Sequence, residues 1–360
     1  MDKGMCLWEE NVRKVTPYTP GEQPAGKRNI KLNTNENPYP PAPGVEQALK
    51  NIDADLLRRY PDPNGEPLRS AIAGLCGVSK EKIFLGVGSD EVLALAFLTF
   101  FNGEKPILFP DITYSFYDVW AELYGIPYER IPLDPDFRIR KEDYCKPCGG
   151  IVLANPNAPT GVELAQEVLE EIIEAHKDVV VIVDEAYVDF GARSVQPLLD
   201  KYDQLLIVRT FSKSRSLAGM RLGYAIGNEK LIKYLSDIKF SFNSYTINRT
   251  TILAGVEACR DQEYFEKTVD RIIRERERTG ERLQNLGFEF FKSKTNFLFV
   301  THPSLPIPEL FDYLRERGIF VRHFQKPERI VPYLRITIGT EEEMDELIKA
   351  IETFAGEHRA

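Results

Sequence analysis

Histidine, tryptophan, methionine and cysteine are all scarce in this chain of 360 residues, which has 4, 2, 4 and 5 of them. The cysteines are odd in number and scattered, so a disulfide framework is not indicated and a reduced, cytoplasmic compartment is expected. Cys145 and Cys148 form a C-x-x-C pair, but without a second pair or nearby histidines they do not indicate a zinc site. No histidine has triad or metal-site spacing, and we expect no metal.

Long apolar runs and a basic excess are also missing. No stretch approaches the roughly 18 residues that cross a bilayer, and the N-terminus has no signal-peptide pattern, so no membrane association is expected. The chain has 46 basic and 55 acidic residues and a net charge of −9, which argues against a general affinity for nucleic acid. Its length and its 43% apolar residues allow a large core and two domains.

Short, almost wholly apolar segments recur along the first two thirds of the chain. They alternate with amphipathic stretches such as 89–101 and 164–176, and such runs are typical of strands that are buried on both faces. This rhythm predicts an α/β protein with a mostly parallel sheet flanked by helices. The predicted strands are 83–87, 107–109, 151–154, 179–183, 205–208 and 222–226.

The pattern changes near residue 245. One long, charged, amphipathic helix is expected over about 256–286, and a smaller α+β domain follows. Its expected elements are a strand at 296–300, a helix at 308–317, short strands at 319–321 and 333–338, and a helix after 340. The Pro- and Gly-rich N-terminal arm should complete this domain. We therefore expect a large domain over 37–247 and a small one from 1–36 and 248–360.

Lys213 lies in a loop directly after the predicted strand 205–208. Ligands of parallel sheets bind beyond the carboxyl ends of the strands, which is where this lysine falls. Neighbouring hydroxyls and Arg221 could hold a phosphate, and a nearby cation lowers the pKa of a lysine toward the neutral amine that carbonyl chemistry requires. By itself, such a segment could also be a surface loop.

Two further motifs lie at predicted strand ends. Asp184 ends a strongly apolar strand, where a carboxylate needs a cationic partner such as a protonated pyridine nitrogen; a helix N-cap or a metal ligand would also fit. The Gly88-Ser89-Asp90 turn joins a strand to a helix, where free backbone N–H groups can receive an anion, although plain helix capping fits equally well. The turn is not a P-loop and lacks G-x-G-x-x-G, which excludes a nucleotide site of those types.

The order of these motifs resembles the fold-type-I, pyridoxal-phosphate-dependent aminotransferases over about residues 15–350. Within that family the sequence is most similar to the histidinol-phosphate aminotransferase branch. The resemblance rests on Gly88-Ser89-Asp90, Tyr114, Pro156-Asn157-Ala158-Pro159-Thr160-Gly161, Asp184-x-x-Tyr187, Ser212-Lys213 and Arg335. Segments close to the branch are Pro17-Tyr18, residues 32–39, Arg59-Tyr60-Pro61, residues 217–219 with Arg221, and residues 334–337.

The resemblance implies that pyridoxal 5′-phosphate is the cofactor and that Lys213 bonds to it covalently and then moves the proton of transamination. Asp184 would bind the pyridinium nitrogen, Tyr187 would bind the phenolic oxygen, and Tyr114 would stack on the ring. Tyr60 would reach the cofactor's phosphate from the other subunit of a homodimer with shared active sites. The groups expected around that phosphate are Ser89, Thr210, Ser212 and Arg221, and Gly88 and Asp90 are also expected to bind the cofactor.

The resemblance also implies the substrates. Arg335 would hold the distal anion, Arg322 would help it grip the phosphate of histidinol phosphate, and Tyr18 and Asn35 would line the pocket. The implied reaction is transfer of the amino group to 2-oxoglutarate, giving imidazole-acetol phosphate and glutamate in histidine biosynthesis. An aromatic amino-acid aminotransferase, a lyase such as threonine-phosphate decarboxylase, and a cofactor-binding regulatory domain are the alternatives. The second arginine favours a phosphate, because a doubly charged group can use two guanidinium groups.

One position departs from the family pattern. The family places an asparagine directly before Pro-Thr-Gly, where it binds the cofactor's phenolic oxygen, but this chain has Ala158 there and Asn157 one step earlier. Either Asn157 reaches the oxygen through a shifted loop, or Tyr187 binds that oxygen alone. We favour Asn157, because the oxygen otherwise lacks a second donor that stabilises its anionic form.

Overall fold

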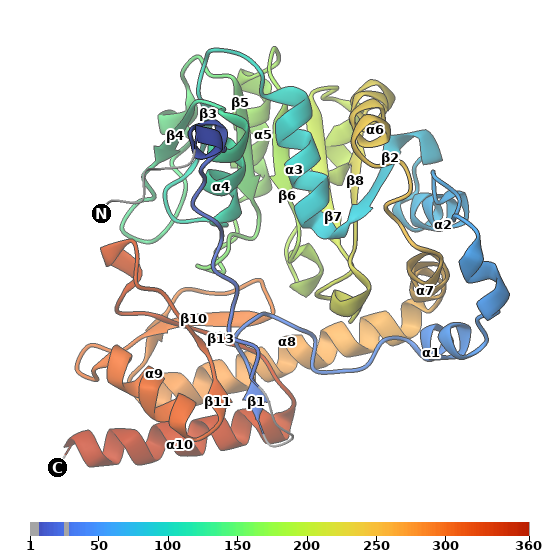
Figure 1. Ribbon diagram of the computed structural model, residues 1–360. Coiled ribbons are helices and arrows are strands. Elements are labelled where there is room, and N and C mark those ends of the chain that lie inside the picture. The colour runs from blue at the N-terminus through green and yellow to red at the C-terminus, as the bar shows by residue number, and fades with distance from the viewer. Residues whose placement is uncertain (1–6, 25–28, 360) are drawn as a thin grey trace.

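The computed structural model describes residues 7–24 and 29–359 of the chain. A large sheet with helices on both faces forms the upper part of the molecule in Figure 1, and a smaller α+β unit lies below it. The large sheet has the strand order β2 (Ile83–Val87), β8 (Leu222–Gly227), β7 (Leu205–Thr210), β6 (Val181–Asp184), β5 (Gly150–Ala154), β3 (Ile107–Pro110) and β4 (Tyr128–Ile131).

The structure confirms a mostly parallel sheet and all six predicted strands. Strand β8 is the exception in direction, because it runs antiparallel to both of its neighbours, β2 and β7. Strand β4 was not predicted; it lies at the edge of the sheet, and its sequence Tyr-Glu-Arg-Ile leaves the two central side chains exposed. An edge strand with charged residues lacks the apolar run by which the other strands are recognised.

Helices cover both faces of the large sheet. The α-helices are α1 (Pro43–Lys50), α2 (Glu66–Cys76), α3 (Gly88–Phe100), α4 (Phe116–Tyr124), α5 (Gln166–Ala175), α6 (Glu229–Phe242), α7 (Arg249–Arg260), α8 (Gln262–Asn285), α9 (Ile307–Glu316) and α10 (Glu341–Arg359). The 3-10 helices are η1 (Leu7–Asn11), η2 (Ala54–Arg58), η3 (Lys80–Lys82), η4 (Lys141–Tyr144), η5 (Val188–Phe190), η6 (Gln196–Asp200), η7 (Ala218–Met220) and η8 (Glu328–Ile330).

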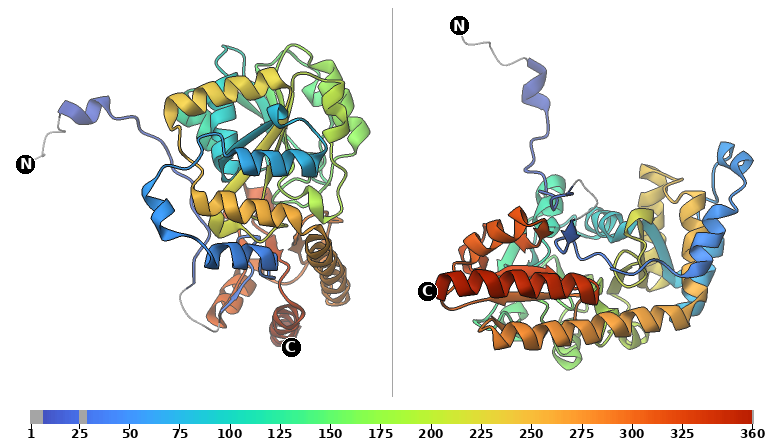
Figure 2. Two further views of the ribbon diagram at one scale, coloured as in Figure 1. Left: turned by 90° about the vertical axis from the view of Figure 1, so that its right-hand side faces the viewer. Right: turned by 90° about the horizontal axis from the view of Figure 1, so that it is seen from below.

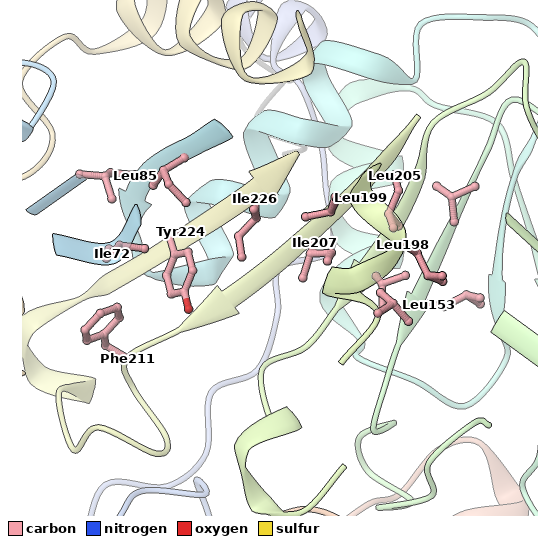
Figure 3. Close-up of a cluster of buried hydrophobic side chains, with 14 of the residues drawn as sticks. Ile72, Leu85, Leu153, Leu198, Leu199, Leu205, Ile207, Phe211, Tyr224 and Ile226 are labelled. Carbon is pink, nitrogen blue, oxygen red and sulfur yellow. The ribbon is translucent and has the colours of Figure 1, made fainter. Parts of the chain in front are cut away.

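The core of the large sheet consists of two apolar layers, one on each face. One layer, drawn in part in Figure 3, takes side chains from α2, α5 and α7, and the other takes them from α3, α4 and α6. Successive residues of β7 alternate between the layers: Leu205 and Ile207 belong to the first, and Leu206 and Val208 to the second. Burying each such side chain contributes about 1.5–3 kcal/mol, so a strand that is apolar on both faces is fixed from both sides.

The smaller unit has an antiparallel sheet of β12 (Arg322–His323), β13 (Leu334–Thr337), β10 (Phe297–Thr301) and β9 (Glu289–Phe290), packed on α8, α9 and α10. The N-terminal arm joins this unit, because β1 (Ile30–Lys31) pairs in parallel with β11 (Ile319–Phe320). Ahead of β1, the segment with η1 projects away from the body in both views of Figure 2.

The prediction of one long helix over 256–286 is wrong, because the chain breaks at Asp261 between α7 and α8. The carboxylate of Asp261 accepts a hydrogen bond of 3.0 Å from the backbone N–H of Tyr264, which makes it the N-cap of α8. The apolar side chains of α7, including Ile252 and Ala258, pack in the core of the large sheet. The domain boundary at residue 247 stays a prediction, and this packing favours a boundary after α7.

Within residues 7–24 and 29–359, no helix has both the length and the apolar character needed to span a bilayer. The same residues contain no cluster of three metal-ligating side chains. Cys145 is an exposed free thiol and Cys148 a buried one.

Candidate active site

A cavity of about 340 Å³ lies beyond the carboxyl ends of β5, β6 and β7. Ala154, Asp184 and Thr210, the last residues of these three strands, all reach it. The cavity therefore occupies the edge of the sheet at which ligands of parallel α/β proteins bind. The predicted cofactor-binding residues that line it are Ser89, Asp90, Tyr114, Asp184, Tyr187, Thr210, Ser212, Lys213 and Arg221.

Lys213 follows β7, and its amine donates a hydrogen bond of 3.0 Å to the backbone carbonyl of Thr34 in the arm. Burial, assisted by the positive charge of Arg335, lowers the pKa of Lys213 to about 8. At pH 7 roughly a tenth of this amine is therefore unprotonated, far more than for a lysine at its ordinary pKa. A neutral amine beyond the carboxyl ends of the parallel strands can attack a carbonyl group or accept a proton.

Asp184 ends β6 and is only 5% exposed. Its carboxylate accepts hydrogen bonds from the hydroxyl of Tyr117 at 2.9 Å and from the backbone N–H of Ala186 at 3.1 Å. Burial raises the pKa of Asp184 to about 6. Neither hydrogen bond brings a positive charge, so a cationic group in the cavity would stabilise the ionised carboxylate.

Tyr117 is a residue of the candidate site that the sequence did not lead us to predict. It is fully buried on α4, and its hydroxyl fixes the orientation of the Asp184 carboxylate. The sequence contained one clue to it. Tyr117 follows Tyr114 by three positions, and side chains at this spacing lie next to each other when the chain forms a helical turn. Their rings meet edge to face, with centroids 5.7 Å apart.

The other end of the cavity is built for an anion. Helix α3 starts at Gly88, so that Ser89 lies in its first turn, where backbone N–H groups are free. Gly88 has a φ of 77°, and a Cβ atom there would lie 2.5 Å from Nη2 of Arg221. A larger residue would be strained at this φ and would displace that guanidinium, which donates a hydrogen bond of 2.9 Å to Asp90. The hydroxyl of Tyr114 donates to the same carboxylate at 2.8 Å.

Arg322 and Arg335 face each other directly on β12 and β13. Nη2 of Arg335 donates to the carbonyl of Asn33 at 2.9 Å, while its Nε is buried without a partner in the described part of the chain. Burial and the charge of Arg322 lower the pKa of Arg335. Neither arginine lines the main cavity, and Arg322 lines a neighbouring one of about 250 Å³. The structure thus brings the two predicted substrate arginines together.

Tyr18 and Tyr60 lie outside the main cavity. The ring of Tyr18 stacks on Phe116 with centroids 4.3 Å apart, at the start of α4. Tyr60 is 78% exposed and stacks on Tyr245 with centroids 4.5 Å apart. In this arrangement Tyr60 does not contribute to the cavity of its own chain.

The family model described as aminotransferase class I and II matches residues 27–351. The chain belongs to this family. Histidinol-phosphate aminotransferase from Chromohalobacter salexigens is 53% identical over 346 residues, which cover 96% of this chain and 98% of that protein. The enzyme of the same name from Brachyspira hyodysenteriae is 52% identical over 343 residues, covering 95% and 97%.

A solved structure shows that the fold is also similar to that of a histidinol-phosphate aminotransferase. Histidinol-phosphate aminotransferase from Sinorhizobium meliloti, in complex with pyridoxal-5′-phosphate, has a TM-score of 0.82 and 25% sequence identity, and the match covers 91% of each chain. The predicted family and the predicted fold class are therefore both confirmed.

In this aminotransferase the structure does not bring Asn157 to the main cavity. Its amide nitrogen donates to the carbonyl of Ile112 at 2.9 Å and to the hydroxyl of Thr160 at 3.0 Å, and its oxygen accepts from Thr113 at 2.8 Å. Asn157 lines a separate cavity of about 300 Å³, while Ala158 lines the main one. The geometry therefore favours the alternative in which Tyr187 alone binds the cofactor's phenolic oxygen.

The arm contributes residues whose positions the sequence analysis did not resolve. Thr34 and Glu36 line the main cavity, and Glu36 lies near Lys213. Burial would raise the pKa of Glu36, but hydrogen bonds from Lys31 and Thr34 outweigh burial and lower it. Asn35 does not line the cavity; it is buried, and its amide nitrogen donates to the hydroxyl of Tyr187 at 2.8 Å. The only signal was the motif at residues 32–39.

Proposed function

We propose that this aminotransferase transfers the amino group of histidinol phosphate to 2-oxoglutarate, with pyridoxal 5′-phosphate as its cofactor, in the biosynthesis of histidine. The products are imidazole-acetol phosphate and glutamate. The observation that carries the proposal is the 53% identity, over nearly the full length of both proteins, to a relative named for this activity. The geometry of the site supports it independently.

The cavity suits this cofactor in its size and in the chemistry of its two ends. A phosphate group would lie at the start of α3, with the hydroxyls of Ser89, Thr210 and Ser212 and the guanidinium of Arg221 as donors. The ring nitrogen would face Asp184, whose buried carboxylate has no cationic partner of its own in its two hydrogen bonds. Lys213 lines the same cavity, and its amine would bond to the cofactor's carbonyl carbon.

When bound, the cofactor supplies an electron-withdrawing ring that stabilises negative charge on the reacting carbon of the substrate. The carboxylate of Asp184 would keep the ring nitrogen protonated, and Tyr117 holds that carboxylate in place. The Lys213 amine, whose pKa burial lowers to about 8, would accept the proton from the substrate's Cα and deliver it to the carbon that was the cofactor's carbonyl carbon. Tyr114 would cover one face of the ring.

Arg322 and Arg335 supply the substrate specificity in this proposal. Like charges directly opposite each other on paired strands are unfavourable, and an anion between them would reverse that effect. The buried Nε–H of Arg335, which lacks a partner in the described part of the chain, is a donor ready for such an anion. A phosphate can accept hydrogen bonds from both guanidinium groups, whereas the distal carboxylate of glutamate offers fewer acceptors.

We further propose a homodimer in which Tyr60 completes the partner's active site. Tyr60 belongs to a set of large, exposed apolar or aromatic side chains, which suggests a surface that pairs with another subunit. Members of this set are Leu57, Tyr60, Phe242 and Tyr245, with exposed fractions of 58%, 78%, 76% and 44%. We place the enzyme in the cytoplasm, where the four free thiols that the structure describes would stay reduced.

The experiment that tests the substrate is a parallel assay of the purified holoenzyme with histidinol phosphate, phenylalanine and threonine phosphate. We expect kcat/KM for histidinol phosphate to exceed that for phenylalanine by about a hundredfold or more, because a substrate without the phosphate leaves the buried Nε–H of Arg335 without an acceptor. A preference for phenylalanine would instead identify an aromatic aminotransferase. Release of carbon dioxide from threonine phosphate would identify a lyase.

A further inference from the structure

Tyr187, Asn35 and Thr337 form a chain of hydrogen bonds in which the direction of every proton can be worked out. Tyr187 follows β6, Asn35 lies in the arm, and Thr337 ends β13. Asn35 and Thr337 are buried, with exposed fractions of 1% and 2%, so solvent does not compete for their donors. The three residues thus link the cavity to the arm and to the small sheet.

The hydroxyl of Thr337 sets the direction of the chain. It accepts a hydrogen bond of 3.0 Å from the backbone N–H of Asn35. Its own proton then goes to the side-chain oxygen of Asn35, also at 3.0 Å. In the opposite orientation of the amide, the Thr337 hydroxyl would receive two donors and its proton would have no acceptor among the described residues. The amide oxygen of Asn35 therefore faces Thr337.

With its oxygen fixed in this way, Asn35 presents its amide nitrogen to Tyr187, and the hydroxyl of Tyr187 accepts at 2.8 Å. In the described part of the chain, that hydroxyl has no acceptor for its own proton. Tyr187 lines the main cavity, and we infer that its hydroxyl proton is left to point into it. Asn35 is suited to its place in a second way, because its φ of 56° lies in the left-handed region that asparagine tolerates.

We propose that Thr337 and Asn35 are positioning residues that make Tyr187 an obligatory hydrogen-bond donor to the cofactor's phenolic oxygen. This inference rests on the proposed function, because it needs the cofactor in the cavity. It explains how the site works with Ala158 on the cavity wall and with the amide of Asn157 engaged elsewhere. One donor with a fixed direction stabilises the oxygen's anionic form where a second donor is lacking.

The test uses Thr337→Val, which keeps the shape of the side chain but removes its hydroxyl. The Asn35 amide can then turn over, and the Tyr187 proton can leave the cavity. The visible absorption of the bound cofactor changes with pH as the proton associated with its phenolic oxygen leaves. Because a lost donor makes that oxygen more basic, we expect the pH midpoint of this change to rise by about half to one unit.

The Tyr187→Phe background separates positioning from general structural damage. If Thr337 acts through Tyr187, Thr337→Val should shift the midpoint in the wild-type background and leave it unchanged when Tyr187 is Phe. Thr268→Val is the matched control, because Thr268 is also a buried threonine, with hydroxyl bonds to backbone carbonyls of α8. It should leave the midpoint at the wild-type value.

Asn35→Asp tests the same chain by reversing its last bond. An ionised carboxylate can only accept, so it would draw the Tyr187 proton away from the cavity and raise the midpoint at least as far as Thr337→Val does. Equal shifts by Thr337→Val in both backgrounds, or no shift in either, would overturn the inference. Failure of the proposed function looks different, since wild-type protein would then show no cofactor absorption or would prefer another substrate.

Discussion

The two ends of the active site are built in different ways. Lys213 follows β7 and Asp184 ends β6, and the apolar side chains of both buried strands are fixed by the two layers of the large core. Arg322 and Arg335 lie on short strands of the small sheet, next to an arm that pairs through only two residues. In the proposed function, the first region holds the groups that every substrate needs, and the second holds those that choose between substrates. Changes in the two regions should therefore have different kinetic signatures.

The largest effect is expected for Lys213→Ala. Without the amine, the rate of transamination should fall by about 10²–10⁴-fold or more, since general acid–base catalysis alone contributes that much. Borohydride should trap the cofactor on a peptide that contains Lys213 in the wild-type protein and on none in the variant. Lys201→Ala, a change of an exposed lysine, serves as the control and should keep wild-type activity. Trapping on any other lysine would contradict the assignment.

Asp184→Asn should come next. It keeps the shape of the side chain and removes the charge that keeps the ring nitrogen protonated, so transamination of every substrate should fall by several orders of magnitude. The measurement is kcat/KM in both half-reactions, with Asp200→Asn on the exposed surface as the control. A loss below about tenfold, or roughly 1.4 kcal/mol of barrier, would show that Asp184 does not bind the ring.

Variants of Tyr60 test whether a residue of one subunit contributes to the active site of the other. Mixtures of Tyr60→Ala with Lys213→Ala subunits should regain activity, because one site of each hybrid dimer has its own Lys213 and the partner's intact tyrosine. Random exchange should restore up to about a quarter of wild-type activity, since half of the dimers are hybrids with one complete site. Hybrid formation is checked with differently tagged subunits. Hybrids that form without any gain would exclude a shared site.

Arg322→Ala should discriminate between the two half-reactions. Loss of charge-assisted bonds worth about 1.5–3 kcal/mol should lower kcat/KM for histidinol phosphate by roughly ten- to a hundredfold. The loss for glutamate should be smaller. Arg315→Ala is a matched control in the same neighbouring cavity, because its guanidinium is already paired with Glu22. Equal losses for both substrates would mean that Arg322 does not act on the phosphate.

The smallest expected effect is that of the Arg335 charge on the pKa of Lys213, which couples the two regions electrostatically. The protonated Lys213 amine cannot attack a carbonyl group, so covalent attachment of the cofactor to the apoenzyme should become faster as the pH rises through about 8 and then level off. Arg335→Leu removes a positive charge that lowers this pKa, so the midpoint should rise by about half to one unit. Borohydride trapping after short mixing times measures the rate. An unchanged midpoint would show that the charge of Arg335 does not influence the pKa of Lys213.

The sequence was sufficient to predict the large sheet and the residues at its strand ends. Six strands could be found because each is a short apolar run, and the position of Lys213 and Asp184 then followed from a general property of parallel sheets. The direction of β8 could not be read in this way. A strand that is buried on both faces has the same composition whether it runs parallel or antiparallel to its neighbours.

The parts that could not be predicted depend on contacts between distant segments. Asn157 was expected to reach the cofactor, but its amide bonds to Ile112 and Thr113, more than forty positions earlier in the chain at separations of 45 and 44 residues. The break at Asp261 depends on a capping bond that an amphipathic pattern does not reveal. Tyr187 could be assigned from its motif, but the residues that orient its hydroxyl lie near the two ends of the chain.

The bond between Asn35 and Thr337 spans 302 positions. During synthesis on a ribosome, the segments that contain Asp184 and Lys213 are complete well before Thr337 emerges, because synthesis proceeds from the N-terminus at about 5–20 residues per second. A nascent chain could therefore hold the cofactor before the Tyr187 proton is directed into the cavity. The chain would then be able to bind the cofactor first. It would become competent for catalysis only later, once its last residues have left the ribosome and Thr337 can bond to Asn35.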